Sequence, residues 1–211
     1  MVVALEFTMQ FRLLSGLHTT EDRVELWTDK ALALDWHTGR KPILPATSLK
    51  GWLREGAERI LRAVGRPACD GCQPSSICGN CLVCEFFGHP RAKAKLVFED
   101  GKLESERRDT RTSVSLSPYR KTAYYEERLF TTEVAWGQIL TVQGKGFFAT
   151  HEEAKRAAAL LWLVAKAGFA LGGARSRGLG WLELIAFSAR CNGQEIAGEE
   201  IQGVAEALVR G

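Results

Sequence analysis

Five of the six cysteines in this 211-residue chain lie close together, at the spacing of metal ligands. Cys69 and Cys72 form one pair with two intervening residues, Cys78 and Cys81 form a second, and Cys84 follows after two more residues. Thiolates at this spacing suit tetrahedral coordination of zinc. Because we expect a cytoplasmic chain, clustered cysteines point to a metal rather than to disulfides.

Five cysteines compete for the four positions of such a site. The tightest loop uses Cys69, Cys72, Cys78 and Cys81, and Cys84 can replace one of them. An iron–sulfur cluster is the alternative, because cysteines separated by two residues also hold such clusters. Four thiolates leave no open position for a catalytic water, so the pattern favours a structural zinc ion.

A second candidate is the loop 172–180, which reads Gly-Gly-Ala-Arg-Ser-Arg-Gly-Leu-Gly. Its glycines let the backbone turn tightly and leave it open to close approach, while its arginines add positive charge. This combination is typical of a cradle for a polyanion; the alternative is a structural turn between a helix and a strand. The candidate residues are Gly172, Gly173, Arg175, Arg177 and Gly178.

A third candidate is the start of a predicted helix after Pro45. Thr47 or Ser48 offers an N-cap, and apolar residues then follow at helical spacing as far as Val64. Ser48, Lys50 and Arg54 surround amides that point outward at this helix end, a combination that can bind phosphate. The alternative is a solvated basic face.

Residues 104–128 are rich in charge and hydroxyl groups and poor in apolar side chains. We therefore expect an extended loop or hairpin that projects from the core. Arg111, Tyr119 and Arg120 belong to a series of basic and aromatic residues, which suits backbone neutralisation and base stacking on a single strand. A mobile, solvated hairpin is the alternative.

The elements that must position these groups follow from the hydrophobic pattern. Residues 3–13 alternate with a period of two, which predicts a strand buried on one face. An irregular excursion, 21–46, carries three aspartates, Asp22, Asp29 and Asp35. Strands are predicted within 96–100 and 129–142, a helix over 151–166, a strand over 181–189, and a C-terminal helix. This order predicts an α+β, ferredoxin-like core, similar to an RNA-recognition motif, with insertions.

The bulk composition is that of an ordinary soluble globular protein, with 45% hydrophobic and 25% charged residues. A net charge of +3 neither demands nor excludes nucleic acid, and the local distribution of charge is more informative. The apolar run 157–164 is too short to span a membrane, so we expect a cytoplasmic protein with no membrane partner.

Taken together, these motifs resemble the RAMP superfamily of CRISPR effector proteins, in particular the backbone subunit of type III complexes of the Csm and Cmr kinds. Pro42–Arg54 is similar to the family's proline–hydroxyl–Leu-Lys-Gly helix start. Cys81–Gly88 resembles its cysteine–Phe-Gly element, and Thr131–Val134 resembles the strand after its thumb hairpin. The glycine-rich loop 172–180 is the hallmark of the superfamily. Ala46 departs from the pattern, which commonly has glycine there.

The resemblance implies a single RAMP domain over 1–211, with a loop insertion at 21–46, a zinc-binding insertion at 66–92 and a thumb hairpin at 104–128. It implies that the chain binds CRISPR RNA and single-stranded target RNA alongside other copies of itself and other effector subunits. The implied RNA contacts are Ser48, Lys50, Arg54, Arg111, Tyr119, Arg120, Gly172, Gly173, Arg175, Arg177 and Gly178.

Family members that cut target RNA use an aspartate before the proline element, with a divalent metal such as magnesium. In this chain the match falls on Asp29, with Asp35 as the fallback. Three other functions remain open. The first is a non-catalytic backbone or capping subunit. The second is a guide-processing endoribonuclease with His18 or His37 as base, although a structural role for His18 is favoured. The third is a zinc-stabilised interaction module unrelated to RNA.

Overall fold

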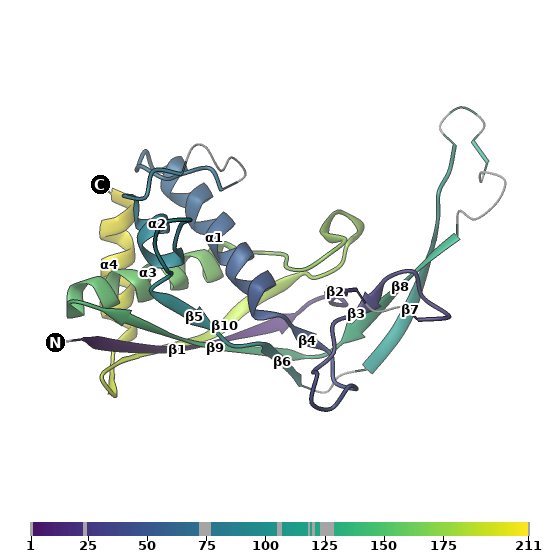
Figure 1. Ribbon diagram of the computed structural model, residues 1–211, viewed down its shortest axis with the longest axis horizontal. Coiled ribbons are helices and arrows are strands. Elements are labelled where there is room, and N and C mark those ends of the chain that lie inside the picture. The colour runs from purple at the N-terminus through teal and green to yellow at the C-terminus, as the bar shows by residue number, and fades with distance from the viewer. Residues whose placement is uncertain are drawn as a thin grey trace.

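The chain folds around an antiparallel sheet that carries helices on one face (Figure 1). The structure, a computed structural model, describes residues 2–22, 25–71, 77–104, 107–117, 119, 121–122 and 129–210. Its strands are β1 (Val3–Leu13), β2 (Thr20–Glu21), β3 (Ala31–Leu32), β4 (Ile43–Leu44), β5 (Leu96–Phe98), β6 (Gly101–Glu104), β7 (Arg107–Val114), β8 (Leu129–Trp136), β9 (Ile139–Phe148), β10 (Leu182–Cys191) and β11 (Gln194–Glu195). Its helices are α1 (Ala46–Ala63), α2 (Leu82–Phe87), α3 (His151–Ala167), η2 (Arg175–Arg177) and α4 (Gly198–Arg210).

The order of the strands confirms the predicted ferredoxin-like core. The main sheet runs β11-β10-β1-β9-β6-β4, and β5 also pairs with β9. The first strand of the chain therefore lies between the last long strand and β9, with α1 and α3 as the crossovers. Strand β1 pairs antiparallel with both neighbours, and its register with β10 shifts between Gln10 and Phe11.

The core lies between this sheet and the helices. The alternation predicted for β1 is confirmed, because Leu5, Phe7, Met9 and Phe11 are buried while the residues between them are partly or fully exposed. All four helices, α1 to α4, lie over the same face in Figure 1. None of the helices in the described part of the chain is long and apolar enough to cross a membrane.

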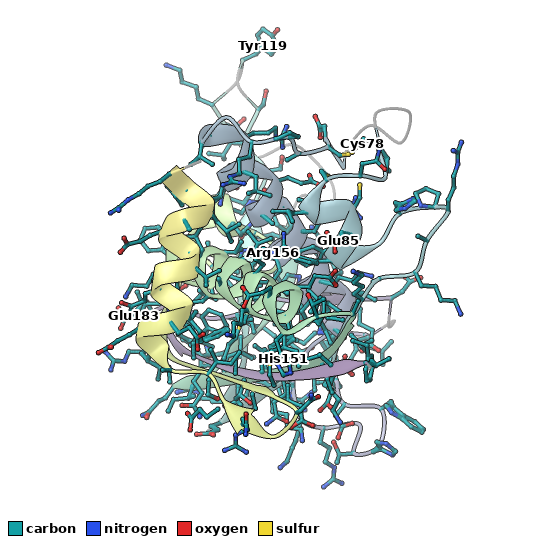
Figure 2. The ribbon with its side chains drawn as sticks, turned by 90° about the vertical axis from the view of Figure 1, so that its left-hand side faces the viewer. Cys78, Glu85, Tyr119, His151, Arg156 and Glu183 are labelled. Carbon is teal, nitrogen blue, oxygen red and sulfur yellow. The ribbon has the colours of Figure 1, made fainter. Side chains whose placement is uncertain are left out.

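Strands β7 and β8 form a second, two-stranded sheet that projects beyond the body as an arm (Figure 1). Their register runs from Arg107 opposite Trp136 to Val114 opposite Leu129. The arm confirms the hairpin predicted from the polar composition. Tyr119, beyond the end of β7, is 93% exposed and stands clear of the body (Figure 2). Arg120 lies outside the described residues.

Helix α1 begins two residues earlier than its capping pattern predicts. It starts at Ala46, Pro45 occupies the cap position, and no side chain of the cap accepts a hydrogen bond. The prediction that Thr47 or Ser48 caps the helix was therefore wrong. The capping acceptor comes instead from the β5–β6 turn, because Asp100 Oδ1 accepts a hydrogen bond from Ala46 N at 2.7 Å.

The loop 172–180 docks main chain against main chain on the segment that follows β1. Gly173 N donates to the His18 carbonyl at 2.7 Å, and Gly180 N donates to the Gly16 carbonyl at 2.8 Å. Gly172 and Gly180 have φ values of +89° and +73°, a region that disfavours any side chain. A Cβ at Gly172 would also overlap the His18 carbonyl oxygen, so this docking requires glycine.

Two glycine-to-alanine substitutions distinguish the cost of close main-chain packing from the cost of a left-handed backbone conformation. Gly178 has φ of +81° and nothing within 4 Å of the Cβ position, whereas a Cβ at Gly180 would overlap the Leu171 carbonyl oxygen. We expect Gly178→Ala to lower the free energy of unfolding by about 1–2 kcal/mol, the cost of the left-handed conformation. Gly180→Ala should cost more than about 3 kcal/mol, because the loop must also move.

Urea unfolding of the two variants measures both costs. Equal losses of stability would show that the loop does not depend on close contact between main chains at Gly180.

Candidate nucleic-acid cleft and metal centre

The start of α1 and the glycine-rich loop line one open cleft of about 350 Å³. Two motifs more than a hundred residues apart in the chain are thereby brought together. Gly51 is exposed in the helix, and nothing lies within 4 Å of the position of a Cβ there, so a ligand can approach the helix backbone closely. The lining residues are Thr19, Thr20, Ser48, Gly51, Trp52, Glu55, Gly172, Gly173 and Arg175.

The charged side chains of the cleft interact only weakly with one another. Arg175 Nη1 lies 3.7 Å from Glu55 Oε2, and both side chains are about half exposed. Such a surface ion pair contributes little stability and can exchange for a phosphate. Lys50, next to Gly51, is half-buried and makes no ion pair in the part of the chain that the structure describes. The cleft thus offers hydroxyls, open backbone and available cations.

The same loop also contacts both strands of the arm. The Arg177 guanidinium carbon lies 4.9 Å from the centroid of the Phe130 ring on β8. Arg111 Nη1, on β7, donates a hydrogen bond to the Arg177 carbonyl at 3.1 Å. Both predicted cations are exposed, and Gly178 beside them is open to solvent. The arm and the cleft are therefore joined at the glycine-rich loop.

Asp29 lies at this junction. Its carboxylate Oδ2 accepts a hydrogen bond from Thr131 N at 2.6 Å, and its own amide donates to the Thr131 carbonyl at 3.0 Å. Lys30 then continues alongside β8, where it forms a parallel bridge with Thr132. Because Thr131 follows Phe130, Asp29 and Arg177 contact adjacent residues of one strand. The carboxylate is exposed and held in place by the main chain.

Asp35, the fallback aspartate, is committed to a turn of its own. Its Oδ1 accepts a hydrogen bond from His37 N at 3.2 Å, and its Oδ2 accepts one from Thr38 Oγ1 at 3.0 Å. The hydrogen bond from the His37 amide, the largest cause, lowers the pKa of this carboxyl below its ordinary value. Asp35 lines a different pocket, on the side of β4 and β6, with Lys102 and Glu99.

The structural role favoured for His18 is confirmed. The ring is buried, and its Nδ1 lies 2.7 Å from the Glu133 carbonyl, so Nδ1 carries the proton. Nε2 then accepts a hydrogen bond from Thr20 Oγ1 at 2.9 Å. Burial lowers the pKa of His18, so the ring is neutral at neutral pH. His18 supports the loop through its carbonyl, which accepts from Gly173 N.

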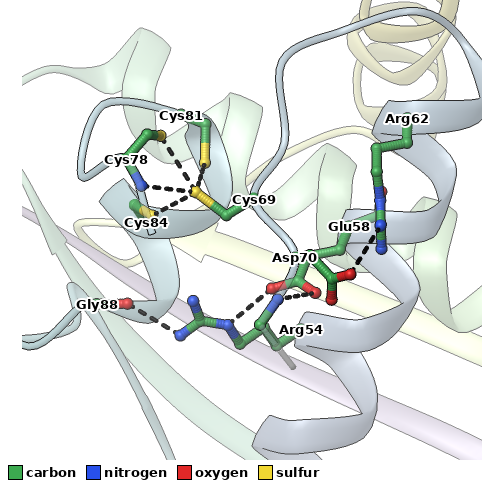
Figure 3. Close-up of polar contacts among 10 residues, drawn as sticks. Arg54, Glu58, Arg62, Cys69, Asp70, Cys78, Cys81, Cys84 and Gly88 are labelled. Carbon is green, nitrogen blue, oxygen red and sulfur yellow. Dashed lines mark hydrogen bonds and ion pairs between the residues drawn. The ribbon is translucent and has the colours of Figure 1, made fainter. Parts of the chain in front are cut away.

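Arg54 faces the segment that carries the clustered cysteines rather than the cleft (Figure 3). Its Nε donates to Glu58 Oε1 at 2.9 Å, and its Nη1 donates to the Gly88 carbonyl at 3.0 Å. Glu58 is buried and also accepts a hydrogen bond from Gly71 N through Oε2 at 3.0 Å. Arg54 and Glu58 therefore fasten α1 to both ends of the cysteine segment. The role of Arg54 as an RNA contact stays a prediction.

Sequence analysis missed Glu58 and Glu133, which hold the surroundings of the cleft in place. Glu58 was detectable from its position four residues after Arg54 on one helix face. Glu133 lies in the motif Thr131–Val134 but is buried, and its Oε2 accepts from Leu32 N at 3.0 Å. Its Oε1 lies 3.4 Å from Arg108 Nη1 on β7. Its partners are distant in sequence, so no local signal reveals this bridge.

Four cysteines converge beside α2 (Figure 3). The Sγ atoms of Cys69, Cys78, Cys81 and Cys84 all lie within 4.8 Å of one another. Cys69 Sγ lies 3.2 Å from that of Cys78, 3.4 Å from that of Cys84 and 3.7 Å from that of Cys81. Sulfurs of a tetrahedral zinc site lie about 3.8 Å apart, so this set fits zinc. Cys72 lies outside the described residues.

The acid–base chemistry of the thiols also calls for a cation. Burial raises the pKa of the Cys84 thiol to about 12, whereas the hydrogen bond from the Asn80 amide lowers that of Cys78 to about 6. All four can be thiolates together only when a positive charge lies among them. A zinc ion would supply that charge and hold the segment to α2.

The cluster predicts which cysteine is dispensable. We expect the purified chain to carry one zinc ion, and Cys72→Ser to retain it, because four other thiols complete the tetrahedron. Cys84→Ser should lose most of the zinc and unfold at lower urea concentration, since metal binding contributes to folding. Cys191→Ser is the control for losing a buried thiol outside the cluster.

Elemental analysis of the metal and urea unfolding decide the assignment. Loss of zinc from Cys72→Ser with retention in Cys84→Ser would exclude the set proposed here. Iron with visible absorbance in place of zinc would favour the iron–sulfur alternative.

Comparisons with known proteins identify the family. A model of the RAMP superfamily matches residues 35–183, and no curated protein matches the chain in sequence. Among solved structures, one match is a chain of the cryo-EM structure of the type III-B Cmr-beta complex bound to cognate target RNA, with a TM-score of 0.61 and 14% sequence identity. That match covers 88% of this chain and 60% of the other, so this chain corresponds to part of its length. Because the family model spans more than half of the sequence, including the cysteine segment, the arm and the glycine-rich loop, this chain belongs to the RAMP superfamily.

Proposed function

We propose that this chain is a backbone subunit of a type III CRISPR effector complex, which binds CRISPR RNA and cuts the complementary target RNA. The observation that carries the proposal is the convergence at β8, where Asp29 and Arg177 contact adjacent residues of one strand of the arm. Membership of the RAMP superfamily and the likeness to a Cmr-beta subunit support it. A strand held in the cleft would reach a fixed carboxylate.

Guide RNA would lie in the cleft between α1 and the glycine-rich loop. Its phosphates would contact the Ser48 hydroxyl, the open backbone at Gly51 and the Arg175 guanidinium, which line the cleft, and also Lys50, which adjoins Gly51 in the helix. Backbone amides and arginines bind phosphate without reading the base, so one cleft can serve guides of any sequence. The arm, with Arg111 in the middle of β7 and Tyr119 beyond the end of that strand, would reach the guide–target duplex and separate a base pair.

Cleavage would occur beside Asp29. The target 2′-oxygen would attack the adjacent phosphorus as its proton leaves, and the bond from phosphorus to the 5′-oxygen would break, leaving a cyclic phosphate and a 5′-hydroxyl. Much of the rate would come from holding these atoms in line. Asp29 would orient the 2′-hydroxyl or hold a divalent cation near the phosphate.

One observation favours the second candidate, a non-catalytic backbone or capping subunit. Among the described residues, the four cysteines are the only group of three or more metal-ligating side chains, so Asp29 belongs to no such group there. A magnesium ion commonly keeps several waters and is completed by substrate phosphates, so a single carboxylate remains compatible with cutting. The cleavage assay below distinguishes the two.

Lys50 and Arg175 are the cations proposed to hold the guide phosphates. We expect Lys50→Ala and Arg175→Ala to weaken binding of a single-stranded guide RNA by the purified chain, because each removes one phosphate contact. Each should also reduce the slope of log affinity against log salt by about 0.7. Arg190→Ala, which removes an exposed arginine from β10, is the matched control and should change neither quantity. Filter binding over a series of salt concentrations measures both quantities. Equal effects from all three variants would mean that charge in general, and not the cleft, attracts RNA.

The negative charge of the Asp29 carboxylate can be removed without losing its hydrogen bond. Asp29→Asn keeps an oxygen that can accept the hydrogen bond from Thr131 N but removes the negative charge. In the assembled complex with guide RNA, we expect it to slow target cutting about 100-fold or more. Guide and target binding should be unchanged. Single-turnover cleavage of a labelled target, in the presence of magnesium, measures the rate.

Asp35→Asn serves as the control, since Asp35 is an exposed aspartate held in its own turn. Undiminished cutting by Asp29→Asn would contradict the assignment of Asp29 as catalytic. The chain would then be assigned as a non-catalytic backbone or capping subunit. Loss of cutting in Asp35→Asn alone would transfer the role to that residue.

A further inference from the structure

The loop between β2 and β3 presents two large apolar side chains to solvent. Glu25 and Thr28 form a bridge that closes a tight turn, with Leu26 and Trp27 at its tip. Leu26 is 92% exposed and Trp27 is 83% exposed. Turns favour glycine, proline, asparagine and aspartate at such positions, so neither residue is explained by the turn itself. A large aromatic surface left in water is a candidate for binding.

The turn is held firmly on its C-terminal side. Directly after Thr28, the amides of Asp29 and Lys30 both donate to the Thr131 carbonyl, at 3.0 and 3.1 Å, and the Lys30 carbonyl accepts from Glu133 N at 2.9 Å. These hydrogen bonds hold the segment alongside β8, where Lys30 forms an isolated parallel bridge with Thr132. Trp27 therefore projects from an anchored edge of the arm sheet.

Trp27 is also close to the carboxylate proposed to serve cleavage. Only Thr28 separates it from Asp29, so their Cα atoms lie at most about 7 Å apart, whatever the conformation of the chain between them. Any nucleotide whose phosphate lies at Asp29 would place its own base, or that of its neighbour, within reach of the indole.

We propose that Trp27 is a stacking platform for an unpaired base of the target RNA, next to the phosphate held at Asp29. This inference rests on the proposed function, and it adds a positioning residue to that function. Stacking would fix the separated nucleotide and so align its 2′-oxygen with the neighbouring phosphorus. Aromatic side chains accept every base in this way, which suits a site that must cut targets of any sequence.

The surroundings favour a base over a protein surface. The residues that follow the turn are exposed and polar, namely Asp29 and Lys30, and Thr131 beside them is only partly buried. Protein interfaces are built around a contiguous apolar core with charged residues depleted. A ring beside a carboxylate, a lysine and hydroxyl groups resembles the combination of stacking and backbone contacts used for single strands.

The test uses the assembled complex carrying Asp29→Asn, so that bound target is not cut. The fluorescent base 2-aminopurine is placed at each target position in turn, and stacking quenches its emission. We expect one quenched position in each repeat of the target, next to the cleavage site. Adding Trp27→Ala should raise emission there towards that of the free nucleotide, whereas Trp27→Phe should keep most of the quenching.

Trp36→Ala is the matched control, because Trp36 is an 80% exposed tryptophan that stacks on His37 in a different turn. It should leave the pattern unchanged. With Asp29 restored, Trp27→Ala should slow single-turnover cutting about tenfold, the loss expected for one stacked base.

Emission that is the same with and without Trp27 at every position would overturn the proposal. Loss of subunits from the complex in Trp27→Ala, measured by native mass spectrometry, would show that the ring contacts protein and would overturn it as well. Because emission is measured without cutting, a quenched position that depends on Trp27, together with a complex that does not cut even when Asp29 is present, would refute the proposed catalysis and leave the platform standing.

Discussion

The close approach of two main chains, between loop 172–180 and residues 16–18, is the contact on which the rest of the candidate site depends. It requires glycine, because a side chain at Gly172 would occupy the place of the His18 carbonyl oxygen. The contact sets the loop at a fixed distance from α1 and thus forms the cleft. It also brings Arg177 onto β8 of the arm, so the cleft and the proposed cleavage position share one support.

Two buried glutamates transmit this support to the rest of the molecule. Glu133 ties β8 to β3 through Leu32 and to β7 through Arg108, so the arm and the loop that carries Asp29 are held together. Glu58 ties α1 to the cysteine segment through Gly71. A buried carboxylate is costly unless its oxygens have partners, so each of these links gives its segments one preferred arrangement. A metal at the cysteines would therefore help to place the helix that lines the cleft.

Local pattern was sufficient for some parts of this structure and not for others. The alternation in β1 and the polar composition of the arm predicted both elements. A strand buried on one face alternates apolar and polar residues, and a strand exposed on both faces is polar throughout, so each pattern is visible in the local sequence. The cap of α1 was predicted wrongly, because its acceptor, Asp100, lies 54 residues away. Spacing indicated a cysteine site but did not select its four members. No local pattern shows that Asp29 and Arg177 contact adjacent residues of β8, because both contacts join segments that are distant in the sequence.

The arm has a sheet of its own, and this limits how its reach can change during evolution. Each added residue advances a strand by about 3.3 Å and turns the following side chains to the opposite face. Insertion of one residue in each of β7 and β8 would reverse the faces of everything beyond it, including the cations. Only the addition of two residues to each strand keeps the same face of the arm towards a bound nucleic-acid strand. The length of the arm can therefore vary only in steps of about 7 Å, and a periodic partner such as a nucleic-acid strand can be matched only in those steps.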